Sequence, residues 1–297
     1  MSPRDFVMPA SRGLADRCSA WVADPGVSPP TKPAATVILV RDGVDGVEVF
    51  VQRRVSTMAF APRMTVFPGG SVDATDYQPL PWAGPSPTEW ASVLAPAPGG
   101  ELDQAGDRHE GDPAGDEAEV SAFATAAAVV TAAIRELFEE AGVLLAGAGE
   151  HTAIEATNTA DLVRARGQLL TRERSLAQVL TENELVARTD LLGFHAHWIT
   201  PEVEPRRYDT YFFSALVPPG QAADAETTEA EIADWVLACD ILQEGTDSLM
   251  PPTRVCLEAI AAAPSAAAFV AARQPVPTVM PVPVLTDRGW AMRADLP

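Results

Sequence analysis

Residues 122–141 carry the strongest helical pattern in this chain of 297 residues. Their apolar side chains recur every three or four positions and so share one face of a helix. The residues on that face are Phe123, Val130, Ile134, Leu137 and Ala141. Gly142 follows directly, and a glycine at this place is a common helix stop. The chain is therefore expected to fold around this helix, with the apolar face of the helix in the core.

The end of this helix also carries three acidic residues, Glu136, Glu139 and Glu140. Their spacing places the carboxylates on one face, roughly 130° from the apolar face at about 100° per residue. Carboxylates so close repel one another unless a cation lies between them, and such hard oxygen ligands suit Mg²⁺ or Mn²⁺. The helix dipole also disfavours negative charge at this end, which is unexpected in a sequence selected for stability alone. A solvated acidic face with an ordinary Arg135–Glu139 ion pair is the alternative.

Other segments predict a mixture of strands and helices. Two β-branched runs, ATVILVRD and VEVFVQRR, are separated by GVDG and predict a hairpin. A short strand at Thr65–Phe67 is expected to stop at Pro68-Gly69-Gly70. Further strands are expected at about 189–200, 207–217 and 232–238, and helices at 86–94, within 155–185 (two), at 253–263 and at 265–273.

The chain divides by composition into an N-terminal arm at 1–33, a domain at 34–273 and a C-terminal tail at 274–297. Within the domain, residues 77–121 hold nine Asp or Glu and one Arg, with many Gly and Pro. Such a segment inside a compact domain is expected to be partly disordered, and a lid or spacer is one hypothesis for it. Its SPTEWASVL stretch predicts a short helix that starts on a Ser cap and docks through Trp90.

The charge of the whole chain restricts its partners. With 41 acidic and 21 basic residues the net charge is −20, which disfavours the coating of nucleic acid. No apolar run of 18 residues that would indicate a membrane span is evident. The three cysteines fit no metal or disulfide spacing, and the N-terminus lacks the apolar core of a secretory signal. A cytoplasmic protein with free thiols is expected, and a homodimer is left open.

The stretch Arg135-Glu136-Leu137-Phe138-Glu139-Glu140-Ala141-Gly142-Val143 resembles the second half of the Nudix box, R-E-U-x-E-E-x-G-U with U aliphatic. The first half of the signature, G-x5-E, is not directly upstream, where Ala127 and Ser121 stand. Gly70-x5-Asp76 fits it instead, after Phe67-Pro68-Gly69, with Asp in place of Glu. The gap from 76 to 135 is 59 residues against 8 in an unbroken box, so about 51 are inserted. This split box is similar to a branch of coenzyme A diphosphatases.

The resemblance implies an α/β/α sandwich with a mixed sheet and a Mg²⁺- or Mn²⁺-dependent hydrolase that splits the diphosphate of a nucleotide conjugate. Coenzyme A or an acyl-CoA is the first expected substrate; ADP-ribose or NADH, or a catalytically silent nucleotide-binding module, are the alternatives. By the same resemblance, Glu136, Glu139, Glu140 and the Gly69 carbonyl hold the metal, and Arg135 fixes a carboxylate by ion pairing. Gly70 and Gly142 belong to the motif, and the shorter side chain of Asp76 could lose a contact.

Residues outside the motif are further candidates. A late-loop carboxylate often completes such a site, and Glu202, Glu204, Glu229 and Glu231 are equally eligible. Arg206, Arg207 and Tyr208 suit phosphate binding and base stacking, although exposed charges at the start of a strand explain the arginines as well. His195 and His197 alternate and are expected on one face of a strand, but without a third ligand they do not indicate zinc.

Overall fold

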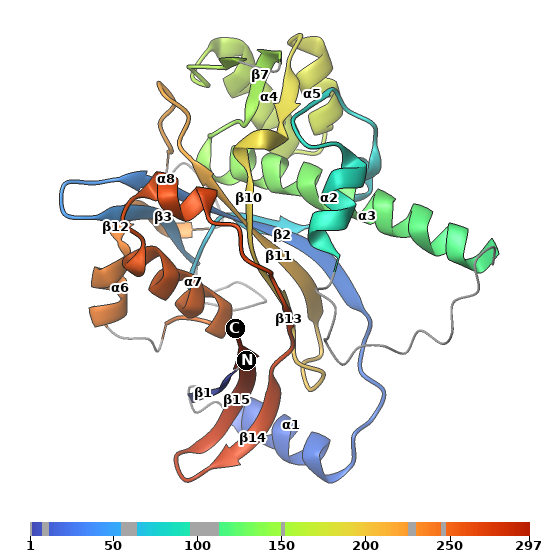
Figure 1. Ribbon diagram of the computed structural model, residues 1–297, viewed down its shortest axis with the longest axis vertical. Coiled ribbons are helices and arrows are strands. Elements are labelled where there is room, and N and C mark those ends of the chain that lie inside the picture. Colours follow the sequence, from blue (N-terminus) through green and yellow to red (C-terminus); the bar gives the residue numbers. More distant parts are fainter. Residues whose placement is uncertain are drawn as a thin grey trace.

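The computed structural model describes residues 2–7, 12–54, 64–95, 113–149, 152–224, 230–244 and 248–297. Within them the chain forms a mixed α/β fold around a central sheet with helices on both faces (Figure 1). The sheet order is β12-β3-β2-β11-β10-β13, with short strands β4 and β5 paired to β3 and β2. The bounds are β2 Thr31–Asp42, β3 Val47–Arg54, β4 Thr65–Val66, β5 Gly69–Ser71, β10 Gly193–Ile199, β11 Arg207–Leu216, β12 Ala230–Leu237 and β13 Thr278–Val279.

Strand β2 organises the sheet, because it is antiparallel to β3 and parallel to β11. The predicted hairpin is confirmed: Val40 lies opposite Val49, and the turn between the strands is closed by Gly43 N–H donating to the Gly46 carbonyl over 2.8 Å. Strand β5 pairs with the earlier part of β2, where Gly70 faces Ala35. The predicted turn at Pro68-Gly69-Gly70 is therefore wrong for the two glycines, which belong to β5 and pair with the central strand β2.

Helix α3 covers one face of the sheet and spans Pro113–Ala141, so it begins earlier than the sequence pattern indicates and ends where predicted. Residues 128–138 are all buried, which makes this a core helix on every side and not only on one face. Arg135 and Glu136 are buried, so the charged end of α3 is not simply a solvated face, while Glu139 and Glu140 stay partly exposed. Phe123 is 40% exposed, so its predicted place in the core is wrong.

One part of α3, Ser121–Ala141, is long and apolar enough to cross a membrane by length and composition alone. This corrects the reading of the sequence, in which no such run was evident. In the structure 67% of that window is buried inside the protein, as in the core helix of a folded domain.

The other face of the sheet is covered by α7 and α8, which contact β10, β3, β11 and β2. The predicted C-terminal helices are confirmed, at α7 Pro251–Ala262 and α8 Ala266–Ala271. A further helix, α6 Ala238–Glu244, packs against α7 and was not predicted. The two faces of the sheet carry separate hydrophobic clusters, one centred on α3 and the other on α7 and α8.

A smaller four-stranded sheet with order β6-β9-β7-β8 lies beside two helices near the end of α3 (Figure 1). Its strands are β6 Trp82–Ala83, β9 Val186–Arg188, β7 Ala146–Gly149 and β8 Thr152–Ala153. The helices α4 Ala160–Leu170 and α5 Leu176–Glu182 confirm the pair predicted within 155–185. Single turns of 3-10 helix, η1 Ala74–Tyr77 and η2 Thr189–Leu191, complete this region.

The segment 77–121 is not uniformly without structure, because it contains β6 and helix α2, Pro87–Leu94. As predicted, Ser86 caps α2, in a capping box with Glu89, and Trp90 is buried with its ring edge-on to Phe213. Residues 96–112 lie outside the described part of the chain, and the lid hypothesis falls on them.

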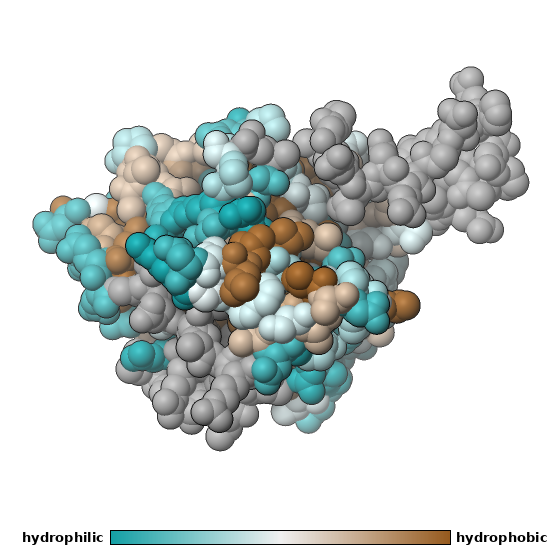
Figure 2. All heavy atoms as spheres, turned by 90° about the horizontal axis from the view of Figure 1, so that it is seen from below, coloured by the Kyte–Doolittle hydropathy of each residue, from teal (hydrophilic) through white to brown (hydrophobic). Residues whose placement is uncertain are grey.

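Both terminal segments carry secondary structure that the sequence prediction did not include. Strand β1 Ser2–Val7 pairs with β15 Gly289–Leu296, which pairs with β14 Val282–Thr286. Helix α1 Arg12–Ala23 contacts β14. Figure 2 views the molecule from this side, where apolar side chains gather among hydrophilic ones. The termini thus meet in one small sheet, although the domain boundaries inferred from composition stay predictions.

Strand β10 contains a register shift between Phe194 and Ala196, where one extra residue interrupts the ladder with β11. For this reason His195 and His197 do not share a face, contrary to the sequence prediction. The His195 ring packs on Phe269 of α8, whereas the His197 ring stacks on Tyr211 and pairs with Asp209.

The half-buried His195 predicts loss of stability in mild acid. Burial, helped by the charge of Arg273, lowers its pKa to about 4, and its Nε2 has no hydrogen-bond partner among the described residues. The unfolded chain takes up this proton below about pH 6.5 and the folded chain does not, so stability falls as pH drops from 6.5 to 4. Between pH 7.5 and 4.5, His195→Leu is expected to lose about 2 kcal/mol less unfolding free energy than the parent. Urea titrations at both pH values measure this; parallel losses in the two proteins would contradict it.

Candidate active site

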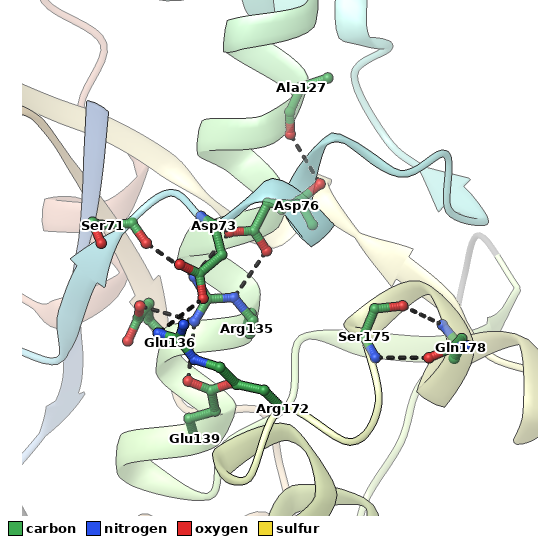
Figure 3. Close-up of polar contacts among 11 residues, drawn as sticks. Ser71, Asp73, Asp76, Ala127, Arg135, Glu136, Glu139, Arg172, Ser175 and Gln178 are labelled. Atoms are coloured by element: carbon green, nitrogen blue, oxygen red, sulfur yellow. Dashed lines mark hydrogen bonds and ion pairs between the residues drawn. The ribbon is translucent and has the colours of Figure 1, made fainter. Parts of the chain in front are cut away.

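An ion pair between α3 and η1 lies at the centre of the polar cluster in Figure 3. Arg135 donates from Nε and Nη2 to the two carboxylate oxygens of Asp76, over 2.8 and 2.9 Å. Both side chains are buried, with residue exposures of 5% and 2%. The shorter Asp side chain thus keeps a two-point contact with the guanidinium. This contact joins residues that are 59 positions apart in the sequence.

The same guanidinium also holds two carboxylates of its own helix. Nη1 of Arg135 donates to Glu136 Oε1 over 2.9 Å and to Glu139 Oε2 over 3.0 Å. Its pKa is raised, because the hydrogen bond to Asp76 and the charges of Glu136, Asp76 and Glu139 outweigh the effect of burial. One cation therefore serves three carboxylates.

One guanidinium does not compensate the acidic cluster. Burial raises the pKa of Glu136 to about 7, even though Arg135 acts in the opposite direction. Burial also raises the pKa of Glu139. With Glu140 included, the cluster has four carboxylates and one guanidinium, a formal charge of −4 + 1 = −3. An environment of this kind favours protons or additional cations.

Gly69 and Gly70 bring the backbone of β5 against the acidic end of α3. Gly69 N–H donates to Glu140 Oε2 over 2.9 Å. A Cβ on Gly69 would lie 2.5 Å from the Ala35 carbonyl oxygen, so the sheet requires glycine here. A Cβ on Gly70 would lie 2.3 Å from Glu136 Oε1, so the carboxylate occupies the space that a side chain would fill.

The C-terminal end of α3 is held by side chains from other elements. Arg166 Nε donates to the Glu139 carbonyl over 3.1 Å, and Gln52 Nε2 donates to the Glu140 carbonyl over 3.3 Å. A donor or positive charge at these carbonyls offsets the negative end of the helix dipole beside the carboxylates. Gly142 has φ +67°, and a Cβ there would lie 2.7 Å from Asp224 Oδ2, so glycine ends the helix without strain.

The acidic cluster lines a cavity of about 1410 Å³. Its polar wall includes Gly69, Gly70, Asp73, Glu136, Glu139 and Glu140. An apolar wall comes from the α7–α8 side of the sheet and from the terminal segments: Leu14, Phe67, Trp198, Phe212, Met250, Pro281 and Met292. Arginines on its rim and walls are Arg17, Arg135, Arg172, Arg174 and Arg206. The arrangement can place a large, partly apolar ligand beside clustered carboxylates.

A protein-family model described as the NUDT19 Nudix domain matches residues 31–253, most of the chain. The chain belongs to this family. The Caenorhabditis elegans protein "Putative nudix hydrolase 7" is 26% identical over 207 residues, which cover 69% of this chain and 52% of that protein. The chain therefore spans about half the length of that curated relative. The crystal structure of a NUDIX hydrolase from Alicyclobacillus acidocaldarius matches with a TM-score of 0.60 and 26% identity, over 84% of this chain and 99% of that one.

Membership of this Nudix family confirms the resemblance seen in the sequence, and the structure brings most of the motif residues together. Arg135, Glu136, Glu139, Glu140, Gly69 and Gly70 all line the cavity. Asp76 lies behind them and holds Arg135. Within the described residues, no three His, Cys, Asp or Glu side chains are arranged as a ready metal site, because Glu136 and Glu139 are turned to Arg135 and Glu140 to the Gly69 N–H.

Of the three residues predicted to contact the substrate, two line the cavity and one does not. Arg206 and Tyr208 line the cavity. Arg207 does not: it is buried, and its guanidinium donates to the Thr200 and Pro29 carbonyls and to Ser28 Oγ. The structure thus corrects the prediction for Arg207, whose guanidinium instead ties the start of β11 to the segment before β2.

The four candidate late-loop carboxylates also differ in where the structure places them. Glu204 lines the cavity, where both of its oxygens accept from Arg17 Nη2, over 2.9 and 3.1 Å. Glu202 lines a different, smaller pocket of about 240 Å³ with Trp21 and Pro281. Glu229 and the side chain of Glu231 lie outside the described residues.

Several residues that line the cavity were not predicted from the sequence. Arg172 and Arg174 come from the loop between α4 and α5, and Leu14, Arg17 and Met292 come from the terminal segments. None of them belongs to the motif, and the terminal segments show no clear period. Only the tertiary fold brings them to the carboxylates.

Proposed function

We propose that this protein is a divalent-metal-dependent diphosphatase that cleaves a nucleoside diphosphate linked to another group. The observation that carries the proposal is the Asp76–Arg135 contact, which joins the two halves of the split motif beside a large cavity. Membership of the NUDT19 Nudix domain family supports the same reaction class. We further propose that 77–121 is the insertion that separates the halves.

The donor set suits Mg²⁺ or Mn²⁺. Glu136, Glu139, Glu140 and the Gly69 carbonyl would supply hard oxygen ligands, and the formal charge of −3 in the cluster leaves room for a divalent cation. When bound, the metal would neutralise the diphosphate and lower the pKa of a coordinated water. Glu136 and Glu139 have to turn from Arg135 to take part.

The chain itself positions these groups. Arg135 fixes the acidic end of α3 to η1 through Asp76, and Gly70 leaves space for the Glu136 carboxylate. The Gly69 N–H orients Glu140. One of the three glutamates would orient or deprotonate the attacking water, because all three line the cavity where the diphosphate would lie.

Coenzyme A or an acyl-CoA is the substrate we propose first. A cavity of about 1410 Å³ exceeds the roughly 300–1,000 Å³ that small ligands usually occupy. Its apolar wall of Trp198, Phe212 and Met292 suits a group less polar than the second nucleoside of NADH. Location in the cytoplasm and a homodimer stay predictions.

A panel of diphosphate conjugates with Mg²⁺ and with Mn²⁺, read by product mass, tests the proposal. Release of 3′,5′-ADP and phosphopantetheine, or its acyl form, is expected, with no turnover in EDTA. Turnover of ADP-ribose or NADH, with no turnover of any CoA species, would support the assignment as a diphosphatase and contradict CoA as its substrate. Nucleotide binding without any turnover would favour a silent module.

Gly70→Ala is expected to separate activity from stability. The new Cβ displaces the Glu136 carboxylate, which is the end of a side chain and not backbone, so stability falls by about 1–3 kcal/mol, the usual cost of an added methyl group in a packed site. Misplacement of a ligand by about 1 Å lowers kcat by about 100-fold. Gly167→Ala in α4 is the control, because nothing lies within 4 Å of its Cβ; it should keep full activity and gain about 0.5–1 kcal/mol. Steady-state kinetics measure kcat, and urea unfolding measures the free energy of unfolding, for both variants.

A further inference from the structure

The loop after α4 reaches the cavity through a residue in a left-handed conformation. Arg172 has φ +60°, and its N–H donates to the Leu169 carbonyl over 2.8 Å, while Glu173 N–H donates to the Gln168 carbonyl over 2.9 Å. These bonds close the helix in a Schellman-type turn, in which glycine is the usual residue at the position of Arg172. An arginine here is strained, so the backbone alone does not explain it.

Helix α5 ends in the same way, which provides an internal comparison. Glu184 has φ +55°, and the following Leu185 N–H donates to the Leu180 carbonyl over 2.8 Å. Among the described residues, these two are the only non-glycine positions with positive φ. Arg172 lines the cavity and Glu184 does not. The two turns share a non-glycine residue with positive φ, and they differ in whether its side chain reaches the cavity.

The side chain of Arg172 is available to a ligand. It is 80% exposed, and its Nη2 lies 3.4 Å from Asp73 Oδ2, beside the cluster in Figure 3. Exposed pairs of this kind contribute little to stability, so the guanidinium can exchange its partner at small cost. Three of the four other cavity arginines have shorter carboxylate contacts: Arg17 with Glu204, Arg135 with Asp76, and Arg174 with Glu182.

The place of Arg172 is next to the proposed reaction centre. The Asp73 N–H donates to Asp76 Oδ2 over 2.8 Å, and Asp76 in turn holds Arg135. A diphosphate that approaches the carboxylates therefore meets Arg172 at the same wall of the cavity. An arginine fork matches phosphate oxygens and offsets the repulsion from the acidic cluster.

We propose that Arg172 binds the diphosphate of the substrate, leaving Asp73 when the substrate enters. This inference rests on the proposed function and adds a substrate-binding residue to it. Arg172 is not part of the Nudix motif in this sequence, and its place at the cavity, which Glu184 does not share, is what assigns it to the ligand.

Arg172→Gly tests this inference with a substitution that suits the backbone. Loss of a charge-assisted contact should raise KM for the conjugate that the parent cleaves by about 10- to 100-fold, with kcat within about threefold. Tm should be unchanged or higher, because glycine adopts φ +60° freely. Glu184→Gly is the matched control. It should change Tm by the same amount as Arg172→Gly and leave KM as in the parent. Arg172→Lys should recover part of the affinity through its charge.

Equilibrium binding of ADP with Mg²⁺, measured by calorimetry, gives a second readout that needs no turnover. If the parent cleaves no conjugate but Arg172→Gly still weakens ADP binding by tenfold or more, the proposed function fails and this inference holds. If the parent is active and Arg172→Gly leaves both KM and ADP affinity unchanged, the inference alone is overturned. A parent that neither cleaves a conjugate nor binds ADP would overturn both.

Discussion

Glu140→Gln is expected to lower kcat for diphosphate hydrolysis by about 10²- to 10⁴-fold, because a metal supplies several kcal/mol and each 1.36 kcal/mol is tenfold. The substitution removes one negative charge and keeps the shape of the side chain. Its amide oxygen can still accept from the Gly69 N–H, which Glu140 Oε2 accepts over 2.9 Å. The fold and Tm should therefore stay close to those of the parent, and steady-state kinetics at saturating Mg²⁺ measure the effect.

Glu173→Gln is the matched control, because it removes one negative charge from an exposed side chain in the loop between α4 and α5. It should leave kcat within about twofold of the parent, as expected for exposed charges screened by solvent. The Mg²⁺ concentration that gives half-maximal rate adds a direct readout, and Glu140→Gln should raise it. A Glu140→Gln protein with parental kcat and parental Mg²⁺ dependence would remove Glu140 from the metal site.

Much of this site could be read from the sequence because its chemistry is local to one helix. Arg135, Glu136, Glu139 and Glu140 lie within two turns, so their spacing fixes their relation. The distant half, Gly70 and Asp76, was found from the resemblance, and the structure explains why Asp replaces Glu without loss of contact: the carboxylate still meets Arg135 at two points.

The remaining features depend on tertiary contacts that no local pattern encodes. The sequence left a solvated face open as the alternative for the charged end of α3, and only the fold shows that η1 and β5 cover Arg135 and Glu136. The role of Arg207 is set by segments more than 70 positions away, at Ser28 and Met280. A single-residue register shift in β10 moved His195 to the other face. Arg172 is recognisable only once its φ and its place in the cavity are known.

Removal of Arg135 is expected to produce the largest loss of stability. In Arg135→Met, Asp76 stays 98% inaccessible without its cation, and Glu136 loses its partner. Breaking a buried pair from one side costs about 3–5 kcal/mol. Arg135→Lys should lose less but not recover fully, because an ammonium cannot make the two-point contact with Asp76 and also reach Glu136 and Glu139. Urea unfolding followed by tryptophan fluorescence, in metal-free buffer at pH 7.5, measures these values.

A control from another helix separates burial from charge. Arg164→Met removes an exposed arginine paired with Asp161 in α4, and should change the unfolding free energy by less than about 1 kcal/mol. Asp76→Asn in the Arg135→Met background removes the stranded charge, so the double variant should be more stable than the sum of the single losses by about 1–3 kcal/mol. Equal losses for Arg135→Met and Arg164→Met, or strict additivity with Asp76→Asn, would mean that the link between the two halves of the motif does not hold the fold together. If the coupling is found, the contact that assembles the site is also one that stabilises the domain.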